Sequence, residues 1–389
     1  MRLGFYYHIP AIKNDEKIFI PGYLGRFLDT LVVFCDELTL FLHLPDPGGN
    51  AKFDYEIQSA NIKLISLRPR GSVPNRMLNT RLFTSVLTNH LESLDALMMR
   101  GPTPLLPAFA EKAKHIPTIL LLVGDYLAGV DSLPHPRWRK ELIRLWSWHN
   151  YRGQLKAANH SLVFVNSHTL FKQFDGKVKN LVETRTTTLT KDDFYKRQDT
   201  CLTRPIHLLY TGRMDPAKGL LDMVKSLSIM TGQGEDVVLD LVGWPEDGSN
   251  VLSDIDLVAK QEGVKDRIVY HGYKAVGPDL FAYYKAADIY IIASQSSFEG
   301  FPRTIWEAMA HSLPVVATRV GSIPDFIEGA AELVEPNNPV ALADGILKII
   351  RIAALRKRNI KIGYSLAERN TLEERVGEMA MHINDWIRK

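Results

Sequence analysis

Residues 299–307 read Glu-Gly-Phe-Pro-Arg-Thr-Ile-Trp-Glu. The run just before them, residues 288–293, is almost entirely apolar and predicts a short buried strand. Residues 304–311 are rich in helix-forming types, and Pro302 stands just ahead of them, which predicts a helix. The two glutamates therefore bracket a loop and a helix start at the carboxyl end of a parallel strand, where ligands bind in open α/β sheets.

This position suits a ligand that carries both phosphate and hydroxyl groups. A helix start offers unpaired N–H groups and the positive end of a dipole, which attract phosphate. Carboxylates accept hydrogen bonds from sugar hydroxyls, so the stretch looks like a pocket for a nucleotide-sugar. We expect Glu299 to reach the hexose of such a ligand and orient its anomeric carbon. Glu307, one turn into the helix, is the better candidate for the ribose hydroxyls. The alternative is a helix with two solvated glutamates, since this spacing also arises by chance.

A second pattern lies earlier in the chain. Residues 206–211 predict a strand, Gly212-Arg213 follows it, and Lys218-Gly219 precedes a helix that begins at Leu220. Arg213 and Lys218 can therefore converge on one point. A guanidinium can bind a phosphate through two N–H bonds while an ammonium supplies a point charge. The alternative is that Arg213 and Lys218 are ordinary loop residues whose charges are solvated.

Together these motifs resemble the donor site of a known enzyme family. The E-x7-E spacing, Ala308-Met-Ala, Pro314-Val-Val-Ala-Thr318 and the G-R-x4-K-G stretch resemble retaining GT-B glycosyltransferases of family 4, also called glycosyl transferase group 1. The resemblance is strong over residues 206–325 and loose before them. It implies an α/β GT-B fold, with two Rossmann-like doubly wound domains facing an interdomain cleft. In such a fold the second domain binds the donor and the first binds the acceptor.

The resemblance also implies a set of site residues. It places the nucleotide base on the backbone just past Gly272 and the leaving diphosphate on the two cations and the helix-start amides. The donor-binding residues are then Arg213, Lys218, Gly243, Gly272, Tyr273, Glu299, Gly300, Phe301, Pro302, Arg303 and Glu307. Glu299, Arg213 and Lys218 are the residues that we expect to act in catalysis, together with Asp125, which is discussed below.

The N-terminal half offers weaker signals. The predicted strand at residues 1–7 is not followed by G-x-G-x-x-G, which removes the main support for a dinucleotide-dependent dehydrogenase. Gly22 and Gly25 instead open a helix that extends to about Phe34, and glycines ahead of a helix allow close approach to an anion. This stretch resembles the family's G-G-x-G-R loop, with Tyr23 in place of the second glycine. A plain helix cap is the alternative.

Further strands are expected in the first half of the chain. The predicted ranges are Leu38–Leu42, Ile62–Leu67, Leu94–Met98, Thr118–Val123 and Leu162–Val165. Their alternation with helical segments predicts a parallel, doubly wound sheet. Asp125 follows one of these strands, and the resemblance places it where family members often carry an acceptor-side His or Asp. Capping of the next helix is the alternative role for Asp125.

Residues 135–156 are basic and aromatic. They contain Arg137, Arg139, Lys140, Arg144, Arg152 and Lys156 against Glu141 alone, interleaved with Trp138, Trp146, Trp148 and Tyr151. Such a helix can rest on an anionic membrane surface. It is equally consistent with an ordinary helix that packs Leu142, Ile143 and Trp146 inward and has a solvated basic face.

Composition restricts the remaining possibilities. The chain has 389 residues, 46% hydrophobic and 23% charged, which suits a globular protein of two domains. Its net charge of +3 does not indicate nucleic acid, and two distant cysteines argue against a disulfide framework. No apolar run is long enough to span a bilayer and no signal pattern opens the chain, so we expect a cytoplasmic protein.

The expected domain boundaries follow from these patterns. We predict an acceptor domain at residues 1–190 and a donor domain at residues 205–370, joined by a polar crossing at residues 184–204. The last helix is predicted from Leu372 to Ile387, and the resemblance implies that this segment, within residues 371–389, packs back on the first domain. Asp254 and Asp256 match a D-x-D metal motif, but they lie within a predicted helix and are expected to form a solvated face.

The predicted reaction is hexose transfer with retention of anomeric configuration. The donor is expected to be UDP-glucose rather than GDP-mannose, and the acceptor a sugar or a lipid-linked saccharide, in polysaccharide or glycolipid synthesis. Neither a metal nor another cofactor is expected. Two alternatives stay open: a non-hydrolysing nucleotide-sugar epimerase of GT-B-like fold, and a non-catalytic partner in a polysaccharide assembly complex.

Overall fold

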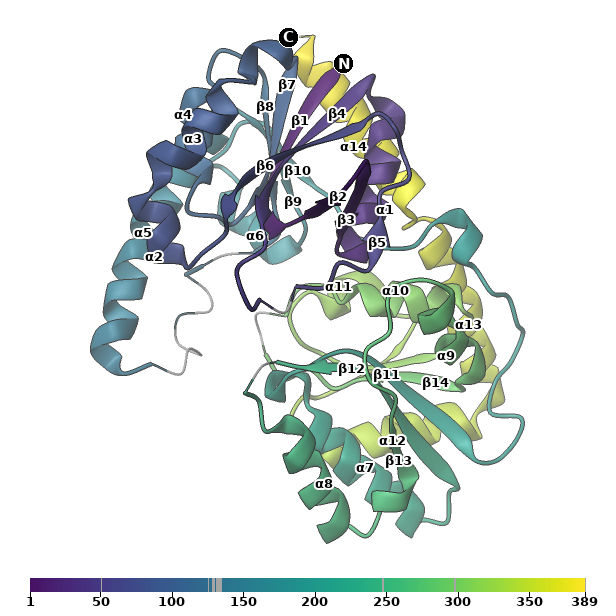
Figure 1. Ribbon diagram of the computed structural model, residues 1–389. Coiled ribbons are helices and arrows are strands. Elements are labelled where there is room, and N and C mark those ends of the chain that lie inside the picture. Colours follow the sequence, from purple (N-terminus) through teal and green to yellow (C-terminus); the bar gives the residue numbers. More distant parts are fainter. Residues whose placement is uncertain are drawn as a thin grey trace. The chain divides into compact units, whose positions relative to one another are not determined.

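The computed structural model describes residues 1–49, 51–124, 126–127, 130, 135–246, 248–296 and 299–388 (Figure 1). The chain divides into two units. Unit 1 comprises Met1–Thr186 and Leu372–Lys389, and unit 2 comprises Thr187–Thr371. Each unit is described separately below.

Unit 1 is built on a seven-stranded parallel sheet with the strand order β10-β9-β8-β7-β1-β4-β6. The strands are β1 (Arg2–Pro10), β4 (Glu37–Leu44), β6 (Ile62–Pro69), β7 (Ala96–Gly101), β8 (Thr118–Leu122), β9 (Leu162–Val165) and β10 (Leu181–Glu183). A small antiparallel sheet, which the sequence did not reveal, consists of β2 (Ile12–Asn14), β3 (Lys17–Ile20) and β5 (Tyr55–Glu56). The parallel, doubly wound sheet that the sequence predicted is confirmed for this unit.

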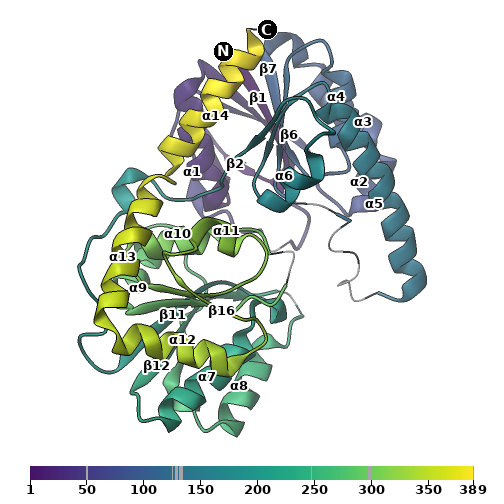
Figure 2. The ribbon, with the colours of Figure 1, turned by 180° about the vertical axis from the view of Figure 1, so that it is seen from behind.

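Helices cover both faces of the sheet in unit 1 (Figures 1 and 2). They are α1 (Gly22–Leu31), η1 (Val32–Phe34), α2 (Val73–Leu78), α3 (Thr80–Thr88), η2 (Leu91–Ser93), α4 (Leu106–Lys112), α5 (Arg137–Ala158), α6 (His168–Phe174) and α14 (Leu372–Ile387). Alternation along the strands explains the two layers, because Phe5 faces a core completed by α1 and α14 while Tyr6 faces a core completed by α3, α4 and α6. The last helix therefore belongs to unit 1, where it packs against α1.

Unit 2 has a six-stranded parallel sheet with the order β13-β12-β11-β14-β15-β16. Its strands are β11 (Ile206–Met214), β12 (Val237–Pro245), β13 (Ile268–Tyr270), β14 (Ile289–Ile292), β15 (Val315–Thr318) and β16 (Glu332–Val334). Its helices are η3 (Lys191–Asp193), η4 (Pro216–Lys218), α7 (Leu220–Gly232), α8 (Val251–Gln261), η5 (Lys265–Arg267), α9 (Pro278–Ala286), α10 (Arg303–Ala310), α11 (Ile323–Ile327), α12 (Pro339–Arg351) and α13 (Ala353–Glu368).

The polar segment between the predicted domains is mostly part of unit 2. From Thr187 onward it packs there, with Leu189 fully buried in the core. Arg197 donates hydrogen bonds to the backbone carbonyls of Tyr284 and Ala287 at the end of α9, at 3.2 and 2.7 Å. Polar residues of this segment thus form hydrogen bonds with backbone groups of unit 2. The sequence pattern had indicated only a connection between two domains.

The buried face of helix α5 consists of polar and small residues, not of the aromatic residues of this helix. Its buried residues are Ser147, Asn150, Gln154 and Ala158. The alternative that packed Leu142, Ile143 and Trp146 inward is wrong for Leu142, because 58% of that side chain is exposed, whereas Ile143 is partly buried. Trp146 is half-buried, with its ring centroid 5.2 Å from that of Tyr126.

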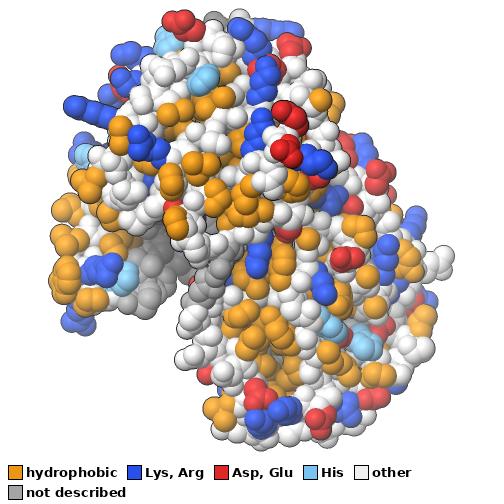
Figure 3. Space-filling view, in the orientation of Figure 1, with side chains coloured by type: hydrophobic (Ala, Val, Ile, Leu, Met, Phe, Trp, Pro, Cys, Tyr) orange, Lys and Arg blue, Asp and Glu red, His pale blue; other side chains and the backbone are white. Residues whose placement is uncertain are grey.

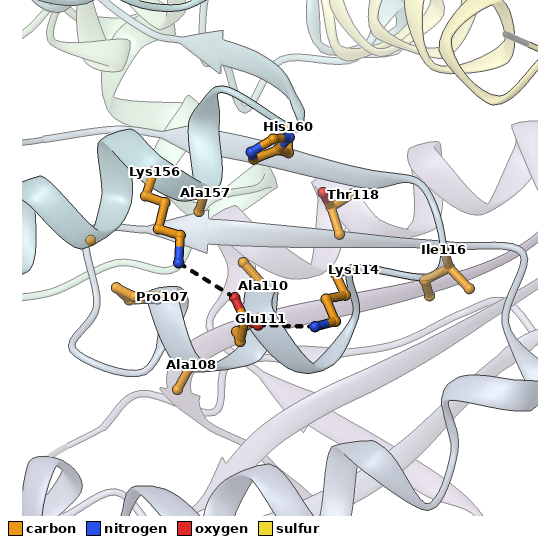
Figure 4. A pocket seen from close by; sticks show the side chains of 11 residues that line it. Pro107, Ala108, Ala110, Glu111, Lys114, Ile116, Thr118, Lys156, Ala157 and His160 are labelled. Atoms are coloured by element: carbon orange, nitrogen blue, oxygen red, sulfur yellow. Dashed lines mark hydrogen bonds and ion pairs between the residues drawn. The ribbon is translucent and has the colours of Figure 1, made fainter.

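A groove of about 620 Å³ lies between α4 and α5 (Figure 4). Glu111 stands in it between Lys114 and Lys156, with N–O distances of 3.2 and 3.9 Å. Thr118, the first residue of β8, also lines it, so the groove lies toward the amino end of this parallel strand. Ligands of open α/β sheets bind at the opposite, carboxyl edge.

Two further expectations concern metals and membranes. Asp256 lies in α8, as predicted, and pairs with Lys260 and Lys265 at 2.6 and 2.9 Å. Within the ranges given above, no group of three or more His, Cys, Asp or Glu side chains is placed to hold a metal ion. None of the described helices has both the length and the apolar character needed to cross a bilayer.

Candidate functional site

Three glycines form the carboxyl edge of neighbouring strands in unit 2. Gly212 and Gly243 lie opposite each other in the register of β11 and β12, and the Gly243 amide donates to the Gly272 carbonyl at 2.9 Å. Gly212 and Gly243 have φ values of 140° and 153°, which L-residues rarely adopt. A Cβ on Gly243 would also overlap the carbonyl oxygen of Gly212. The strand ends therefore present bare backbone, which a ligand can approach closely.

An aromatic pair stands beside this backbone edge. The rings of Trp244 and Tyr273 meet edge to face, with centroids 5.0 Å apart and an interplanar angle of 86°. Tyr273 was expected near a nucleotide base, whereas sequence reasoning missed Trp244. Its position directly after Gly243 at a strand end was the available signal.

Arg213 leaves the end of β11 and is held by carboxylates. Its guanidinium contacts Glu246 at 2.7 Å and Asp215 at 2.9 Å. Asp215 also accepts a hydrogen bond from the Ala217 amide at 2.8 Å, which caps η4. Because the Arg213 and Glu246 side chains are about half exposed, these ion pairs are weak and can be exchanged for another anion at little cost.

Lys218 and Glu299 meet directly. The Lys218 ammonium lies 2.5 Å from a carboxylate oxygen of Glu299, and the two side chains are 18% and 13% exposed. The sequence separation between them is 81 residues. Burial also raises the pKa of Tyr210 well above its ordinary value, and the charges of Glu299 and Asp215 add to this rise. Lys218 and Glu299, which the sequence analysis named as site residues, are thus neighbours in the structure.

Gly219 allows this meeting. Its φ is 67°, and a Cβ there would overlap the carbonyl oxygen of Ala293. The loop after β14 is thereby seated on η4, where the Gln295 amide donates to the Ala217 carbonyl at 2.8 Å. The close approach of backbone to backbone brings Lys218 to the loop that carries Glu299.

Gly219→Ala should therefore destabilise the protein by about 2 kcal/mol, since it combines a left-handed φ with a backbone clash. Gly232→Ala, at the far end of the same helix α7, is the matched control, because a Cβ there meets no atom within 4 Å. We expect it to be neutral or to stabilise by about 0.5 kcal/mol. Urea unfolding measures both values, and equal midpoints for the two variants would contradict the assignment.

Glu299 is fixed through its backbone. Its carbonyl accepts from the Ser322 amide at 3.2 Å, and its own amide donates to the Ser296 carbonyl at 3.1 Å. Gly321, with a φ of 54°, passes so close that a Cβ would overlap the Glu299 carbonyl oxygen. The carboxylate is thus carried by a loop held from two sides.

Helix α10 begins immediately after this loop. Pro302 is its N-cap, no side chain caps it, and its first turn contains no acidic residue. Phe301 packs on Trp306 and Phe326, with ring centroids 4.4 and 5.1 Å apart, and so fixes the entry to the helix. Gly300 has open space where a Cβ would lie. With Arg303 as its first residue, the helix presents its positive end beside Glu299.

Glu307 lies deeper than the sequence suggested. Only 2% of it is exposed, and its two oxygens accept from the hydroxyls of Thr188 at 2.5 Å and Tyr284 at 2.7 Å. Burial raises the pKa of Tyr284 well above its ordinary value, so the phenol stays a donor. The predicted contact of Glu307 with a ribose stays a prediction, and the carboxylate also joins residue 188 to α10.

His311 completes this buried cluster. Its ring stacks on that of Tyr284, with centroids 5.3 Å apart, and its Nδ1 lies 2.7 Å from the Glu307 carbonyl oxygen. Burial lowers the pKa of His311 to about 4, so the imidazole is neutral near pH 7. The hydroxyl network around Glu307 therefore has no neighbouring imidazolium to neutralise the carboxylate.

The glycines expected in unit 1 have other partners. The predicted helix is confirmed, because α1 begins at Gly22 and η1 continues it to Phe34, so Gly25 lies within the first turn. The Gly22 amide donates to Asp54 at 2.8 Å, and a Cβ on Gly25 would overlap the ring of Tyr55. Gly25 thus serves close packing. Asp125, the predicted acceptor-side residue, lies outside the described residues.

The second half of the chain is similar to a known protein family. Residues 192–366 match the family model described as glycosyl transferases group 1. A D-inositol 3-phosphate glycosyltransferase of Pseudarthrobacter chlorophenolicus is 30% identical over 194 residues, 46% of this chain and 45% of that protein. The O-antigen chain mannosyltransferase B of Escherichia coli is 32% identical over 149 residues, 37% of each chain. The chain thus spans less than half the length of these curated relatives.

Solved structures show the fold along the whole chain. HepE of Anabaena, crystallised in complex with UDP and glucose, superposes with a TM-score of 0.72 at 17% identity and covers 99% of this chain and 100% of its own. The predicted fold class, two Rossmann-like α/β domains of the GT-B type, is thereby confirmed.

Proposed function

We propose that this chain, whose residues 192–366 match the family model of glycosyl transferases group 1, transfers a hexose from a nucleotide diphosphate sugar to a saccharide acceptor with retention of configuration. The observation that carries the proposal is the 2.5 Å contact of Lys218 with Glu299 beside the start of α10. One cation and one carboxylate at a strand end suit the two parts of such a donor, its diphosphate and its sugar.

Binding would redistribute these charges. A donor diphosphate offers Lys218 a dianionic partner, and Arg213 can exchange Asp215 and Glu246 for the same phosphates. Glu299 is then released from its ion pair and can accept hydrogen bonds from hexose hydroxyls. The same carboxylate would thus hold Lys218 in position before binding and orient the sugar afterwards.

The chemistry follows from where charge develops. As the bond between the anomeric carbon and the phosphate oxygen breaks, negative charge collects on the leaving diphosphate, and preorganised donors stabilise it. Lys218, Arg213 and the amides at the start of α10 supply these donors without a metal ion. The acceptor hydroxyl attacks the same face of the sugar, and its proton passes to the departing phosphate oxygen. No carboxylate is assigned as a nucleophile.

The preferred donor in this proposal is UDP-glucose. The likeness to HepE, whose structure holds UDP and glucose, supports that choice over GDP-mannose. The bare backbone at Gly272, beside Trp244 and Tyr273, offers amide and carbonyl groups to a base edge and an aromatic wall.

The experiment that tests the proposal combines binding with turnover. UDP, UDP-glucose and GDP-mannose are titrated by thermal shift, since a ligand of the native state raises the melting temperature. Release of UDP with a panel of saccharide acceptors is then followed. An isomerised sugar formed from UDP-glucose alone would indicate an epimerase. No nucleotide release with any donor and acceptor would indicate a non-catalytic partner.

The acceptor is proposed to be a sugar or a lipid-linked saccharide, in polysaccharide or glycolipid synthesis at the cytoplasmic membrane face. The surface of α5 supports the lipid-linked option (Figure 3). Trp138, Leu142, Leu145 and Trp148 follow one another at helical spacing, and each is between 48% and 66% exposed. The Arg152 guanidinium lies 4.8 Å from the centroid of the Trp148 ring, so basic and apolar groups adjoin on the helix. Such a face suits the headgroup region of an anionic bilayer.

The variant Leu142→Gln/Leu145→Gln should bind vesicles that contain phosphatidylglycerol about tenfold less tightly than the unchanged protein, because two leucines no longer bury their side chains. The control, Leu202→Gln, removes a leucine that is 74% exposed in unit 2 and should change nothing. Cosedimentation measures both, with phosphatidylcholine vesicles and high salt as conditions that weaken binding. Equal binding of both variants would contradict the membrane role, and loss of self-association would indicate a second copy as the occupant.

A further inference from the structure

Unit 1 buries two arginines with guanidinium nitrogens that lack partners among the described residues, two in Arg76 and one in Arg100. Arg76, in α2, is 5% exposed, and Arg100, in β7, is 8% exposed. Nε and Nη1 of Arg76 and Nε of Arg100 are shielded from solvent and have no hydrogen-bond partner in the described chain. An arginine cannot lose its charge as a histidine can, so its burial without an acceptor is costly.

A third buried arginine shows how the same chain treats a structural guanidinium. Arg356 in unit 2 is 4% exposed, and Asp199 accepts from it twice, at 2.6 and 3.1 Å. It also donates to the carbonyls of Ile349 and Ile350, at 3.0 and 2.8 Å. Each guanidinium nitrogen of Arg356 thus has a partner at the same degree of burial. The lack of partners at Arg76 and Arg100 therefore sets them apart.

These arginines belong to the edge of the sheet where ligands bind. Arg100 is the penultimate residue of β7, His8 lies near the end of β1, and His43 lies near the end of β4. The three strands are adjacent and parallel, so their carboxyl ends meet at one edge. Arg70 follows the end of β6, the next strand, and lies 3.6 Å from Asp46.

The two histidines add no charge, and only His8 can add a donor. Nδ1 of His43 donates to the Arg68 carbonyl at 3.1 Å, so Nε2 of this neutral ring is an acceptor, whereas Nδ1 of His8 can carry the proton. His8 Nδ1 and His43 Nε2 are buried and also lack partners. Burial, reinforced by the positive charges of Arg76 and Arg70, lowers the pKa of His8 to about 3 and that of His43 to about 4. Both imidazoles are therefore neutral near pH 7.

The electrostatics of the cluster are one-sided. The positive charges of Arg76, Arg70 and Arg100 all act on His8. The carboxylate whose charge reaches both Arg76 and His43 is that of Asp46. Asp46 already binds the Gly71 amide at 2.7 Å. Arg100 lies over the ring of Tyr7, with its guanidinium carbon 4.8 Å from the centroid, a cation–π contact that supplies no hydrogen-bond acceptor in the plane of the ring.

We propose that Arg76 and Arg100, with His8, form an anion site at the carboxyl edge of the unit 1 sheet, and that the site binds a phosphate group of the acceptor. A guanidinium recognises phosphate through paired N–H bonds, and a dianion would satisfy both buried cations at once. This inference rests on the proposed function, because it identifies the acceptor as a phosphate-bearing saccharide, either soluble or lipid-linked.

One substitution at this site should make the protein more stable and at the same time weaken its binding of phosphate. Arg76→Met keeps the length and apolar stem of the side chain and removes the unpaired charge. It should raise the melting temperature in phosphate-free buffer and weaken the binding of inorganic phosphate and pyrophosphate at least tenfold. Arg100→Gln, a second variant with the same expected loss of phosphate binding, keeps the test decisive if Arg76→Met does not fold. Isothermal titration at constant ionic strength, with the proposed donor site of unit 2 saturated by UDP, measures the binding.

Two controls accompany this test. Arg2→Gln removes an exposed arginine that pairs with Asp95 at the amino end of β1, and it should leave phosphate binding unchanged. Arg356→Met should lower the melting temperature strongly, because it leaves Asp199 buried without its partner. If Arg76→Met destabilises as Arg356→Met does, Arg76 is structural and the proposal is wrong. Undiminished phosphate binding by Arg76→Met and Arg100→Gln, or an absence of phosphate binding by the unchanged protein, would also overturn it.

Further titrations identify which molecule carries the phosphate. They also distinguish failure of the anion site from failure of the proposed function. Tighter binding of a hexose phosphate than of inorganic phosphate supports a soluble acceptor, whereas tighter binding of a polyprenyl diphosphate in micelles supports a lipid-linked one. UDP titration reports on unit 2 independently, and Arg76→Met should leave it unchanged. A protein that binds UDP but no phosphate would therefore retain the proposed function and lose only this inference.

Discussion

Glu299→Ala is expected to lower kcat for hexose transfer by ~10³-fold or more while UDP binds within about threefold of its original affinity. The carboxylate orients the sugar in the proposed reaction, and its absence leaves the donor diphosphate free to bind Lys218. Because Glu299 pairs with Lys218 at 2.5 Å, the variant also leaves that ammonium without its carboxylate until nucleotide binds. We therefore expect UDP to stabilise the variant at least as much as it stabilises the unchanged protein.

The matched control is Glu246→Ala. Glu246 also pairs with a proposed donor cation, Arg213, but the Glu246 side chain is 57% exposed. Its removal should change kcat by about twofold at most, as expected for a solvated ion pair. Steady-state kinetics with UDP-glucose and UDP titration measure both variants. Near-normal turnover by Glu299→Ala would remove that carboxylate from the reaction.

Lys218→Met is the second large effect that we expect. It should reduce kcat by ~10²–10³-fold and weaken UDP binding, because a preorganised cation no longer faces the charge that develops on the leaving diphosphate. Arg213→Ala should act in the same direction. Lys225→Met, on the exposed face of α7, is the control and should leave both quantities unchanged.

A double variant makes this second test sharper. In Lys218→Met the Glu299 carboxylate remains, only 13% exposed and without its ammonium, which should lower the melting temperature. Adding Glu299→Gln removes the uncompensated charge, so the double variant should melt above Lys218→Met alone. Additive changes in stability would show that the two side chains do not interact in solution.

Much of the fold could be predicted from apolar runs. The predicted strand at residues 162–165 coincides with β9, and the predicted helix at residues 372–387 coincides with α14. The small antiparallel sheet escaped prediction because strands of two to four residues are too short to show a period. On α5 the pattern could not decide which face is buried, because polar residues such as Ser147 and Asn150 pack inward.

The candidate site could be predicted as a list of residues but not as a set of partners. The motifs identified Lys218 and Glu299, yet nothing in the sequence states that they pair across 81 positions. The hydroxyl of Thr188 reaches Glu307 from 119 positions away, in a segment that carried no recognisable motif. Such pairings depend on close backbone approaches, as at Gly219, which only the folded chain defines.

The position of α14 has a consequence for how the protein is made. Leu372, Val376, Met379 and Ile383 complete a core that otherwise consists of residues from the first part of the chain. Unit 2 is one uninterrupted segment that is synthesised between those two parts. On the ribosome, unit 2 can thus reach its native state while the core of unit 1 still lacks α14. The unit whose synthesis begins first is therefore the one that completes its folding last.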